Sequence, residues 1–155
     1  MIKIITWITK LIVVAITALL FGSCHLNFNS IKGSGHVTSE KRTVESDFKG
    51  VKVSSAIELV IEQADKTEII VEADDNLQQT IATEVKNGQL IITSESHNNI
   101  KEGTRRVIVK MPVIEELQAS SASTIKSANT LKGADLTIKT SSAASTDLSV
   151  EIDHL

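Results

Sequence analysis

The chain is poor in the residues that build disulfide frameworks, aromatic platforms and nucleic-acid interfaces. Its 155 residues include one Cys, no Tyr, one Trp and three Phe. A single Cys excludes an intrachain disulfide framework. Trp7 lies in the N-terminal apolar segment, and beyond that segment Phe28 and Phe48 are the only aromatic residues, too few to stack bases or sugars. The net charge of −3 excludes a typical nucleic-acid-binding surface, whose affinity comes from Lys and Arg.

The N-terminal segment has the pattern of a bacterial signal peptide. Lys3 and Lys10 precede an uncharged apolar run over residues 11–21, and a Gly-Ser pair then leads to Cys24. A basic region, an apolar region and small residues at a cleavage site are the three parts of a secretory signal. The run is shorter than the roughly 20 apolar residues that a membrane-spanning helix needs. The pattern therefore predicts secretion, with Cys24 either lipidated or a free thiol.

Residues 20–24 (Leu-Phe-Gly-Ser-Cys) resemble the lipobox of bacterial lipoproteins, in which the Cys becomes the first residue after cleavage and is acylated. This resemblance implies that Cys24 tethers the mature chain to a membrane, at about 0.8 kcal/mol for each buried methylene. The residue after Cys24 is His25 and not Asp. By resemblance to lipoprotein sorting in Gram-negative bacteria, this residue favours the outer membrane. We therefore expect a signal peptide over residues 1–23, a lipidated Cys and short tether over 24–32, and a folded domain over 33–155.

The folded part shows the period of two that is typical of strands. Apolar and polar residues alternate over residues 51–61 and 107–111, and Pro112 ends the second run. Asn87-Gly88 separates two further runs and favours a hairpin, because a type I′ turn needs positive φ at both positions. Residues 74–76 (Asp-Asp-Asn) are typical caps and predict one helical turn after them. No helical period is sustained after residue 33, so the sequence predicts an all-β fold.

The C-terminal third repeats itself at an offset of 21 residues. Residues 117–125 align with 138–146, so that the tripeptide Ser-Ser-Ala at 120–122 falls on Ser-Ser-Ala at 141–143, and residues 54–56 hold a third copy. Coils of roughly 20 residues, with small side chains at stacked corners and Leu and Ile inside, are typical of a β-solenoid. The pattern therefore predicts a solenoid of short strands behind a hairpin-rich N-terminal region.

Several segments resemble, in order, the head GIN domain family of auto-transporter adhesins, a family of bacterial envelope lipoproteins. They are residues 33–37 (Gly-Ser-Gly-His-Val), 48–63, 71–77, 85–92 and the Ser-Ser-Ala corners. The resemblance implies a right-handed β-helix-like solenoid over residues 33–155 and an adhesin-like role without a defined activity.

Two departures from the family are visible. Family corners often carry Gly-Gly where this chain has Ser-Ala, and members usually run for further coils beyond residue 155. If the domain is truncated there, its last coil exposes a strand row, and self-association through that open C-terminal edge is expected.

The repeated hydroxyls are the candidate binding face. As stacked ladders they would satisfy one another and the main chain, and as a flat polar surface they would meet a repeating ligand such as a glycan or an extended strand. The residues concerned are Ser120, Ser121, Ser123, Thr124, Ser141, Ser142, Ser145 and Thr146.

Signals for catalysis or metal binding are weak. Ser123 and Lys126 have the Ser-x-x-Lys spacing, but in a strand these positions face opposite ways. The four His residues are scattered, and Asp74-Asp75-Asn76 lacks the Gly and the closing Glu of a calcium loop. Arg105-Arg106 indicates a charged loop or a weak anion site. A groove of the polysaccharide-cleaving β-helix enzymes would need clustered carboxylates and a basic residue. The candidate carboxylates are Asp135, Asp147 and Glu151, and the candidate basic residues are Lys126 and Lys139.

The sequence as a whole predicts a lipid-anchored, non-catalytic, adhesin-like binding module of the outer membrane, without cofactor, metal site or nucleic-acid partner. Its ligand is an unidentified protein or glycan. Two alternatives stay open: a periplasmic scaffold that docks partners by strand addition at its last coil, and a carbohydrate-active enzyme on a β-helix scaffold.

Overall fold

The computed structural model describes residues 5–8, 10–14, 30–95 and 99–154. Residues 5–8 and 10–14 are helical. In these four ranges no helix is both long and apolar enough to cross a membrane. The expected cleavage site, Cys24 and residues 25–29 of the expected tether lie outside the described residues.

Strands dominate the domain, as the alternating pattern predicts, so the all-β fold class is confirmed. One 3₁₀ turn, η1 (Gln78–Thr80), follows the fifth strand. The strands are β1 (Ser30–Lys32), β2 (Val37–Arg42), β3 (Gly50–Val53), β4 (Glu58–Gln63), β5 (Glu68–Asp74), β6 (Ile81–Lys86), β7 (Gln89–Ser94), β8 (Asn99–Glu102), β9 (Arg105–Met111), β10 (Glu116–Ala119), β11 (Thr124–Ser127), β12 (Leu131–Asp135), β13 (Thr137–Thr140), β14 (Ser145–Asp147) and β15 (Val150–His154).

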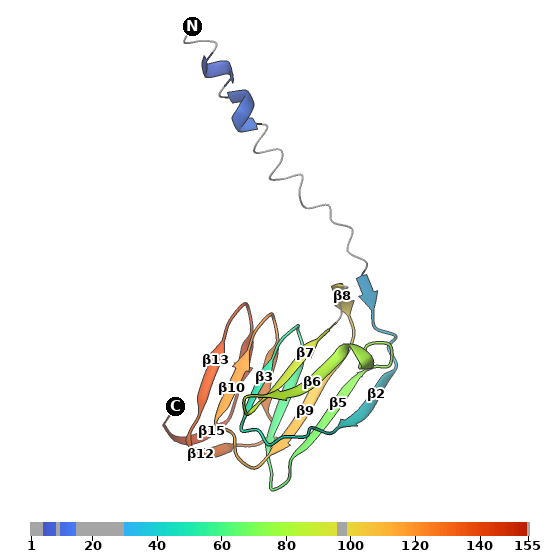
Figure 1. Ribbon diagram of the computed structural model, residues 1–155, viewed down its shortest axis with the longest axis vertical. Coiled ribbons are helices and arrows are strands. Elements are labelled where there is room, and N and C mark those ends of the chain that lie inside the picture. The colour runs from blue at the N-terminus through green and yellow to red at the C-terminus, as the bar shows by residue number, and fades with distance from the viewer. Residues whose placement is uncertain (1–4, 9, 15–29, 96–98, 155) are drawn as a thin grey trace.

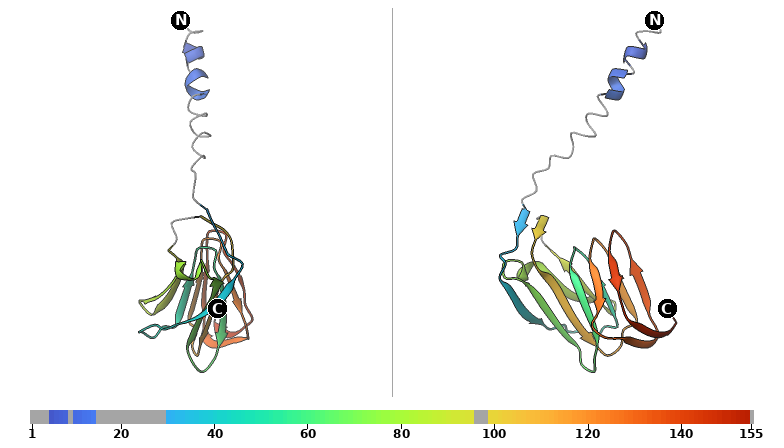
Figure 2. Two further views of the ribbon diagram at one scale, coloured as in Figure 1. Left: turned by 90° about the vertical axis from the view of Figure 1, so that its right-hand side faces the viewer. Right: turned by 180° about the vertical axis from the view of Figure 1, so that it is seen from behind.

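Two sheets face each other across one apolar core (Figures 1 and 2). The larger has the strand order β14-β11-β4-β9-β5-β2 and the smaller has the order β13-β10-β3-β7-β6. Alternate residues of the strands point inward, and Leu59 and Val107 of the larger sheet and Val51, Leu90 and Leu117 of the smaller are fully buried. The period of two thus divides each strand into a core face and a solvent face.

Four strand pairs stack in parallel through both sheets, and we call each pair a rung. In stacking order the rungs are β7/β9, β3/β4, β10/β11 and β13/β14. Leu117 lies opposite Val51 on one side and opposite Ile138 on the other, so the register confirms the offset of 21 residues. The stacking order differs from the chain order. β7/β9 follows β3/β4 in the chain, but it packs on the side of β3/β4 that faces away from β10/β11.

The N-terminal half adds antiparallel strands to this stack. β5 pairs with β9, β2 pairs with β5, and β6 forms a hairpin with β7. In that hairpin Asn87 and Gly88 have φ values of 53° and 74°, as a type I′ turn requires. The hairpin predicted from Asn87-Gly88 is therefore confirmed.

The two ends of the stack hold different parts of the chain. At the corner end, the Ser-Ser-Ala corners join β3 to β4, β10 to β11 and β13 to β14 (Figure 1). β8 is at this end too, because it directly precedes β9, which runs parallel to β4 from that end, and β1 pairs with β8. At the opposite end, the far end, lie the β4–β5 turn and the segment from β2 to β3.

The segment that enters the domain is held at the corner end by the turn at residues 74–76. The Asn76 side chain donates to the Lys32 carbonyl and accepts from the Ser34 amide, while the Ser34 hydroxyl donates to Asp75. The expectation that these side chains cap the following turn is wrong, because η1 has no side-chain cap. They bind residues 32–34 instead, which are neighbours only in the folded chain.

Two glycines allow the close packing of this junction. A Cβ on Gly33 would lie 1.8 Å from Asp74 Oδ2, and a Cβ on Gly103, whose φ is +139°, would lie 2.6 Å from Leu77 Cδ1. The first strand begins at Ser30, three residues before the expected start of the domain at Gly33. This earlier start arises because the main chain of β1 pairs with β8.

Candidate functional site

The three Ser-Ser-Ala corners share one unusual backbone conformation. The second and third residues of each corner have positive φ, which costs an L-residue other than Gly roughly 1–2 kcal/mol. The angles are 64° and 54° at Ser55 and Ala56, 52° and 59° at Ser121 and Ala122, and 51° and 61° at Ser142 and Ala143. Gly adopts positive φ without strain, so the Gly-Gly that the family resemblance implies at such corners would avoid this cost.

Hydrogen bonds join each corner to the next. The Ala56 amide donates to the Ser121 carbonyl at 2.9 Å, and the Ala122 amide donates to the Ser142 carbonyl at 3.0 Å. Small side chains allow this contact, because the main chains at the corners lie as close as neighbouring strands, about 4.8 Å apart. The tripeptides therefore form one row along the corner end.

The hydroxyls predicted as a binding face divide into two groups. Ser120 and Thr124 are half-buried, and the Thr124 hydroxyl pairs with Ser145 Oγ at 3.1 Å. The exposed members are Ser121, Ser141, Ser142, Ser145 and Thr146. Thr146 lies opposite Ile125, at an inward position of β14. The other four side chains are the part of the predicted face that a ligand can reach, and we call them the hydroxyl row.

Ser123 lies beneath this surface and not on it. It is 1% exposed, and its hydroxyl donates to the Val53 and Ser120 carbonyls and accepts from the Ser120 amide. Its inclusion in the binding face is therefore corrected. The sequence did not reveal this burial, because Ser123 directly follows the exposed corner and precedes β11, and so has the pattern of a surface hydroxyl.

The adjacent residues Arg105 and Arg106 have different surroundings. Arg105 reaches the first corner, where it donates to the Ser55 carbonyl at 3.0 Å, and burial lowers the pKa of its guanidinium. Arg106 lies on the solvent face of the larger sheet between Glu58 and Glu72, at 3.5 and 3.6 Å. The pair therefore does not act as one anion site: one Arg supports a strained corner and the other belongs to a charged ladder.

The Ser-x-x-Lys spacing does not produce a catalytic pair. The Ser123 hydroxyl is occupied by the main chain inside the corner, whereas Lys126 is exposed and bonded to Glu58. The expectation that the two residues face opposite ways is confirmed.

The carboxylates and lysines considered for carbohydrate cleavage are not gathered in a groove. Lys126 and Lys139 are ion-paired with Glu58 and Glu116, and Glu151 is ion-paired with Lys132. One of the five candidates, Lys139, lines a groove of about 620 Å³ beside Glu115 and Glu116. Lys139, together with the Gln118 and Gln89 amides, lowers the pKa of Glu116, whereas the general acid of a glycosidase needs a raised pKa.

The residues that could bind a metal ion are also scattered over the domain. No group of three His, Cys, Asp or Glu residues that could hold a metal ion occurs in the part of the chain that the structure describes. Asp75, the most accessible acid of the 74–76 turn, has its pKa lowered mainly by the Ser34 hydroxyl that donates to it. His25 and His97 lie outside the described residues.

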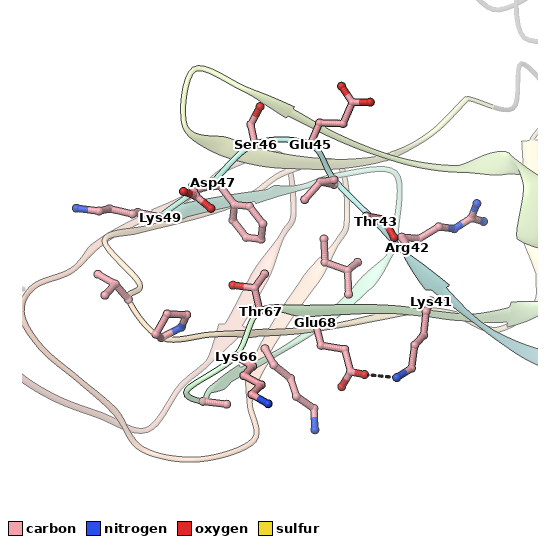
Figure 3. A pocket seen from close by; sticks show the side chains of 17 residues that line it. Lys41, Arg42, Thr43, Glu45, Ser46, Asp47, Lys49, Lys66, Thr67 and Glu68 are labelled. Carbon is pink, nitrogen blue, oxygen red and sulfur yellow. Dashed lines mark ion pairs between the residues drawn. The ribbon is translucent and has the colours of Figure 1, made fainter.

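A second surface feature, which sequence analysis missed, is a groove of about 890 Å³ at the far end (Figure 3). It lies between residues 43–49, where the chain crosses from the larger to the smaller sheet, and the β4–β5 turn. Its apolar lining comprises Val44, Phe48, Ala64, Ile69, Pro112 and Val113. No motif signals this groove, because three separate segments form it.

Comparison with known families and structures gives consistent results. A family model described as "Putative auto-transporter adhesin, head GIN domain" matches residues 47–155. No curated protein matches the chain by sequence.

Several solved structures share the fold. A putative adhesin from Bacteroides fragilis matches with a TM-score of 0.71 and 16% identity over 79% of this chain and 57% of its own. A putative lipid binding protein from Parabacteroides distasonis gives 0.68 and 20% over 80% and 54%. A putative adhesin from Parabacteroides merdae gives 0.61 and 22% over 72% and 46%. The chain thus spans about half the length of these structures, and at these identities the likeness concerns the fold alone.

Proposed function

The chain belongs to the head GIN domain family of putative auto-transporter adhesins, and on that premise we propose that it is a lipid-anchored, non-catalytic binding module of the cell envelope. In this proposal Cys24 carries the anchor in the outer membrane and the stacked domain carries the binding surface. The family resemblance inferred from the sequence is thereby confirmed, and family membership supports an adhesin-like role at the cell envelope.

The solenoid belongs to the same proposal. Parallel rungs at a constant offset, and corners bonded one to the next, support a right-handed β-helix-like path for residues 116–154. β12 pairs with β15 in parallel, and this pair forms a third side of the path beside the two larger sheets.

The observation that carries the binding function is the alignment of the corners. Ser121 and Ser142 have nearly equal φ values, 52° and 51°, on successive rungs, and Ser145 follows on the outermost one. A ligand with a repeat close to the inter-strand spacing, such as a glycan, would meet one hydroxyl group per rung. Affinity from hydroxyls alone would be modest, because residues 30–95 and 99–154 present no exposed Phe, Tyr or Trp side chain beside them.

The position of β1 supports a ligand within the envelope. β1 lies at the corner end, and the six residues 24–29 can span at most about 20 Å. An anchored head would therefore hold the hydroxyl row toward its own membrane and turn the far end away from it. A glycan of the cell's own envelope suits this geometry better than a distant surface.

Cell fractionation tests the anchor. Wild-type protein should be recovered with outer membranes, whereas Cys24→Ser should release the protein or leave its leader uncleaved. Protease should cut the domain on intact cells if it faces outward, and only after permeabilisation of the outer membrane if it faces the periplasm. An unchanged membrane fraction for Cys24→Ser would refute the lipoprotein assignment.

Binding of the full-length chain to purified peptidoglycan sacculi and to a glycan array tests the hydroxyl row. The variant with Ser121, Ser142 and Ser145 changed to Ala should bind at least tenfold more weakly. The control variant, with the exposed Ser39 and Ser46 changed to Ala, should bind like the wild type. Equal binding by both variants would remove the row from the function.

A further inference from the structure

The groove at the far end has features that the hydroxyl row lacks, and it is independent of the proposed row and anchor. Its floor is apolar, with Phe48 and Ile69 contributed from the core and Val113 47% exposed. Its volume of about 890 Å³ lies within the range of about 300–1,000 Å³ that is common for ligand sites.

The main chain along one wall of the groove has no internal partner. Pairing of β2 with β5 ends at Arg42, and β3 begins at Gly50. Between them, the amides and carbonyls of residues 43–48 form no hydrogen bond within the described part of the chain. The stretch bends at Glu45 and Ser46, and its unpaired main-chain groups follow directly on the edge strand β2. Unpaired groups of this kind can pair with an added chain.

Ion pairs neutralise Lys41, Arg42, Lys49 and Lys110 of the lining, and the charges that remain have opposite sign on the two rims. Glu45 and Asp47 stand on the rim formed by the crossing segment, and Lys66 stands on the rim formed by the β4–β5 turn (Figure 3). Lys41 beside it is neutralised by Glu68, whereas Lys66, Glu45 and Asp47 form no ion pair among the described residues. The groove therefore complements a ligand that carries both signs of charge.

Together these features indicate which class of ligand fits the groove. A hydrocarbon chain would fill the floor but leave the main-chain groups of residues 43–48 without partners, which is costly once water is excluded. A glycan would lack a stacking surface, because Phe48 is only 9% exposed. An extended peptide satisfies the main chain, buries alternate side chains on the floor and presents charges to both rims.

We propose that this groove docks an extended peptide segment of a partner protein, which pairs its main chain with residues 43–48 and places alternate apolar side chains against Val44, Phe48 and Val113. Its acidic side chains face Lys66 and its basic side chains face Glu45 and Asp47. The groove lies at the end of the stack opposite the hydroxyl row, so the partner is reached without displacing a ligand of that row.

The test uses the full-length chain in phosphatidylcholine vesicles, with a phage library of random linear dodecapeptides as the probe. Wild-type protein should enrich peptides with apolar residues at alternate positions, and Val113→Asp should weaken the best synthetic peptide at least tenfold. Val37→Asp is the matched control, because Val37 is an equally exposed Val, at 52%, on β2 outside the groove. Both positions are exposed, so both variants should keep the wild-type melting temperature. Failure to enrich peptides, or equal binding to both variants, overturns the proposal.

Methylation of the peptide's amides tests the main-chain pairing separately. N-methylation at every second residue should abolish binding in one of the two registers and leave it in the other, since alternate amides of an added strand face the groove wall. Binding unaffected in both registers overturns the pairing. Displacement of the peptide by oleate from the wild type would assign the groove to acyl chains and also overturn the proposal. None of these outcomes depends on Cys24 or on the hydroxyl row, which have their own tests.

Discussion

The second and third coils of the domain have matching sequences and matching backbones but unequal burial. In the second coil, residues 116–136, the inward residues Leu117 and Ile125 are fully buried. At the equivalent positions of the third coil, residues 137–154, Ile138 is half-buried and Thr146 is exposed. The difference arises because β10 and β11 have hydrogen-bonded neighbours on both sides, whereas β13 and β14 have a neighbour on one side in the described structure.

This comparison shows that position in the stack, and not the repeat itself, decides how much each residue contributes to stability. In stacked repeats each unit contacts only its neighbours, so stability is approximately a sum over interfaces. The second coil therefore contributes through its core and its buried polar group, and the third coil contributes mainly through corners and ion pairs.

The largest effect is expected for the core residues that face each other across the two coils. Leu117→Ala should lower the free energy of unfolding by about 3–4 kcal/mol, because it leaves a cavity in a closely packed site. Ile138→Ala should cost only about 1 kcal/mol, since this side chain already contacts water. Urea denaturation of both variants measures the difference, and equal losses would contradict the proposed dependence on position.

A smaller effect is expected for the position that follows each corner. Ser123→Ala should cost about 1 kcal/mol, because the Val53 and Ser120 carbonyls lose the hydroxyl donor but each keeps a main-chain amide. The equivalent residue 21 positions later is Ala144, and Ala144→Ser should change stability by less than about 0.5 kcal/mol. Thermal unfolding followed by circular dichroism compares the two. A stabilised Ala144→Ser variant would mean that the third coil holds its corner as the second does.

The strained corners should respond alike in both coils. Ala122→Gly and Ala143→Gly should each stabilise the domain by about 0.5–1 kcal/mol, since relief of positive-φ strain exceeds the entropy cost of Gly. Ala128→Gly is the control, because Ala128 has no positive φ, and this change should destabilise the domain. Chemical denaturation distinguishes them. Loss of stability in all three variants would show that the corners are not strained.

The smallest effect concerns the ion pair between the coils. Lys139 first, and then the Gln118 and Gln89 amides, lower the pKa of Glu116 below its ordinary value of 4.5. A lowered carboxyl pKa adds stability above pH 4.5 that is lost as the pH falls through the folded-state pKa. Glu116→Gln should therefore melt below the wild type at pH 7, and this difference should shrink as the pH falls below 4.5. Lys139→Met should reduce the acid sensitivity in the same way, and a gap that is unchanged with pH would argue against this coupling.

Much of the local structure was predictable because it depends on neighbours in the sequence. Alternation placed Val51, Leu59 and Val107 in the core, and Asn87-Gly88 identified the hairpin. The offset of 21 residues identified the stacking of the last two rungs. The hydroxyl row was predictable in outline, since repeated corners must align when their strands do.

Other parts of the site were not predictable, because they depend on residues far apart in the chain. Asp75 and Asn76 have the pattern of a helix cap, yet they bind Ser34 and Lys32 because folding brings β1 next to them. Ser123 reads as one more surface hydroxyl, but its rotamer and the neighbouring Val53 carbonyl place it inside.

The sequence by itself determined the all-β class, the family, the hairpin and the repeat, since each follows from side-chain period, turn chemistry and residue spacing. It also carries the expectation of a signal peptide and of a lipidated Cys24. Only the tertiary structure decided the interleaved order of the rungs, which of the repeated hydroxyls reach solvent, and the groove at the far end. The physical reason is that hydrogen bonding between distant strands and the crossing of one segment between two sheets create burial and concavity that no local pattern encodes.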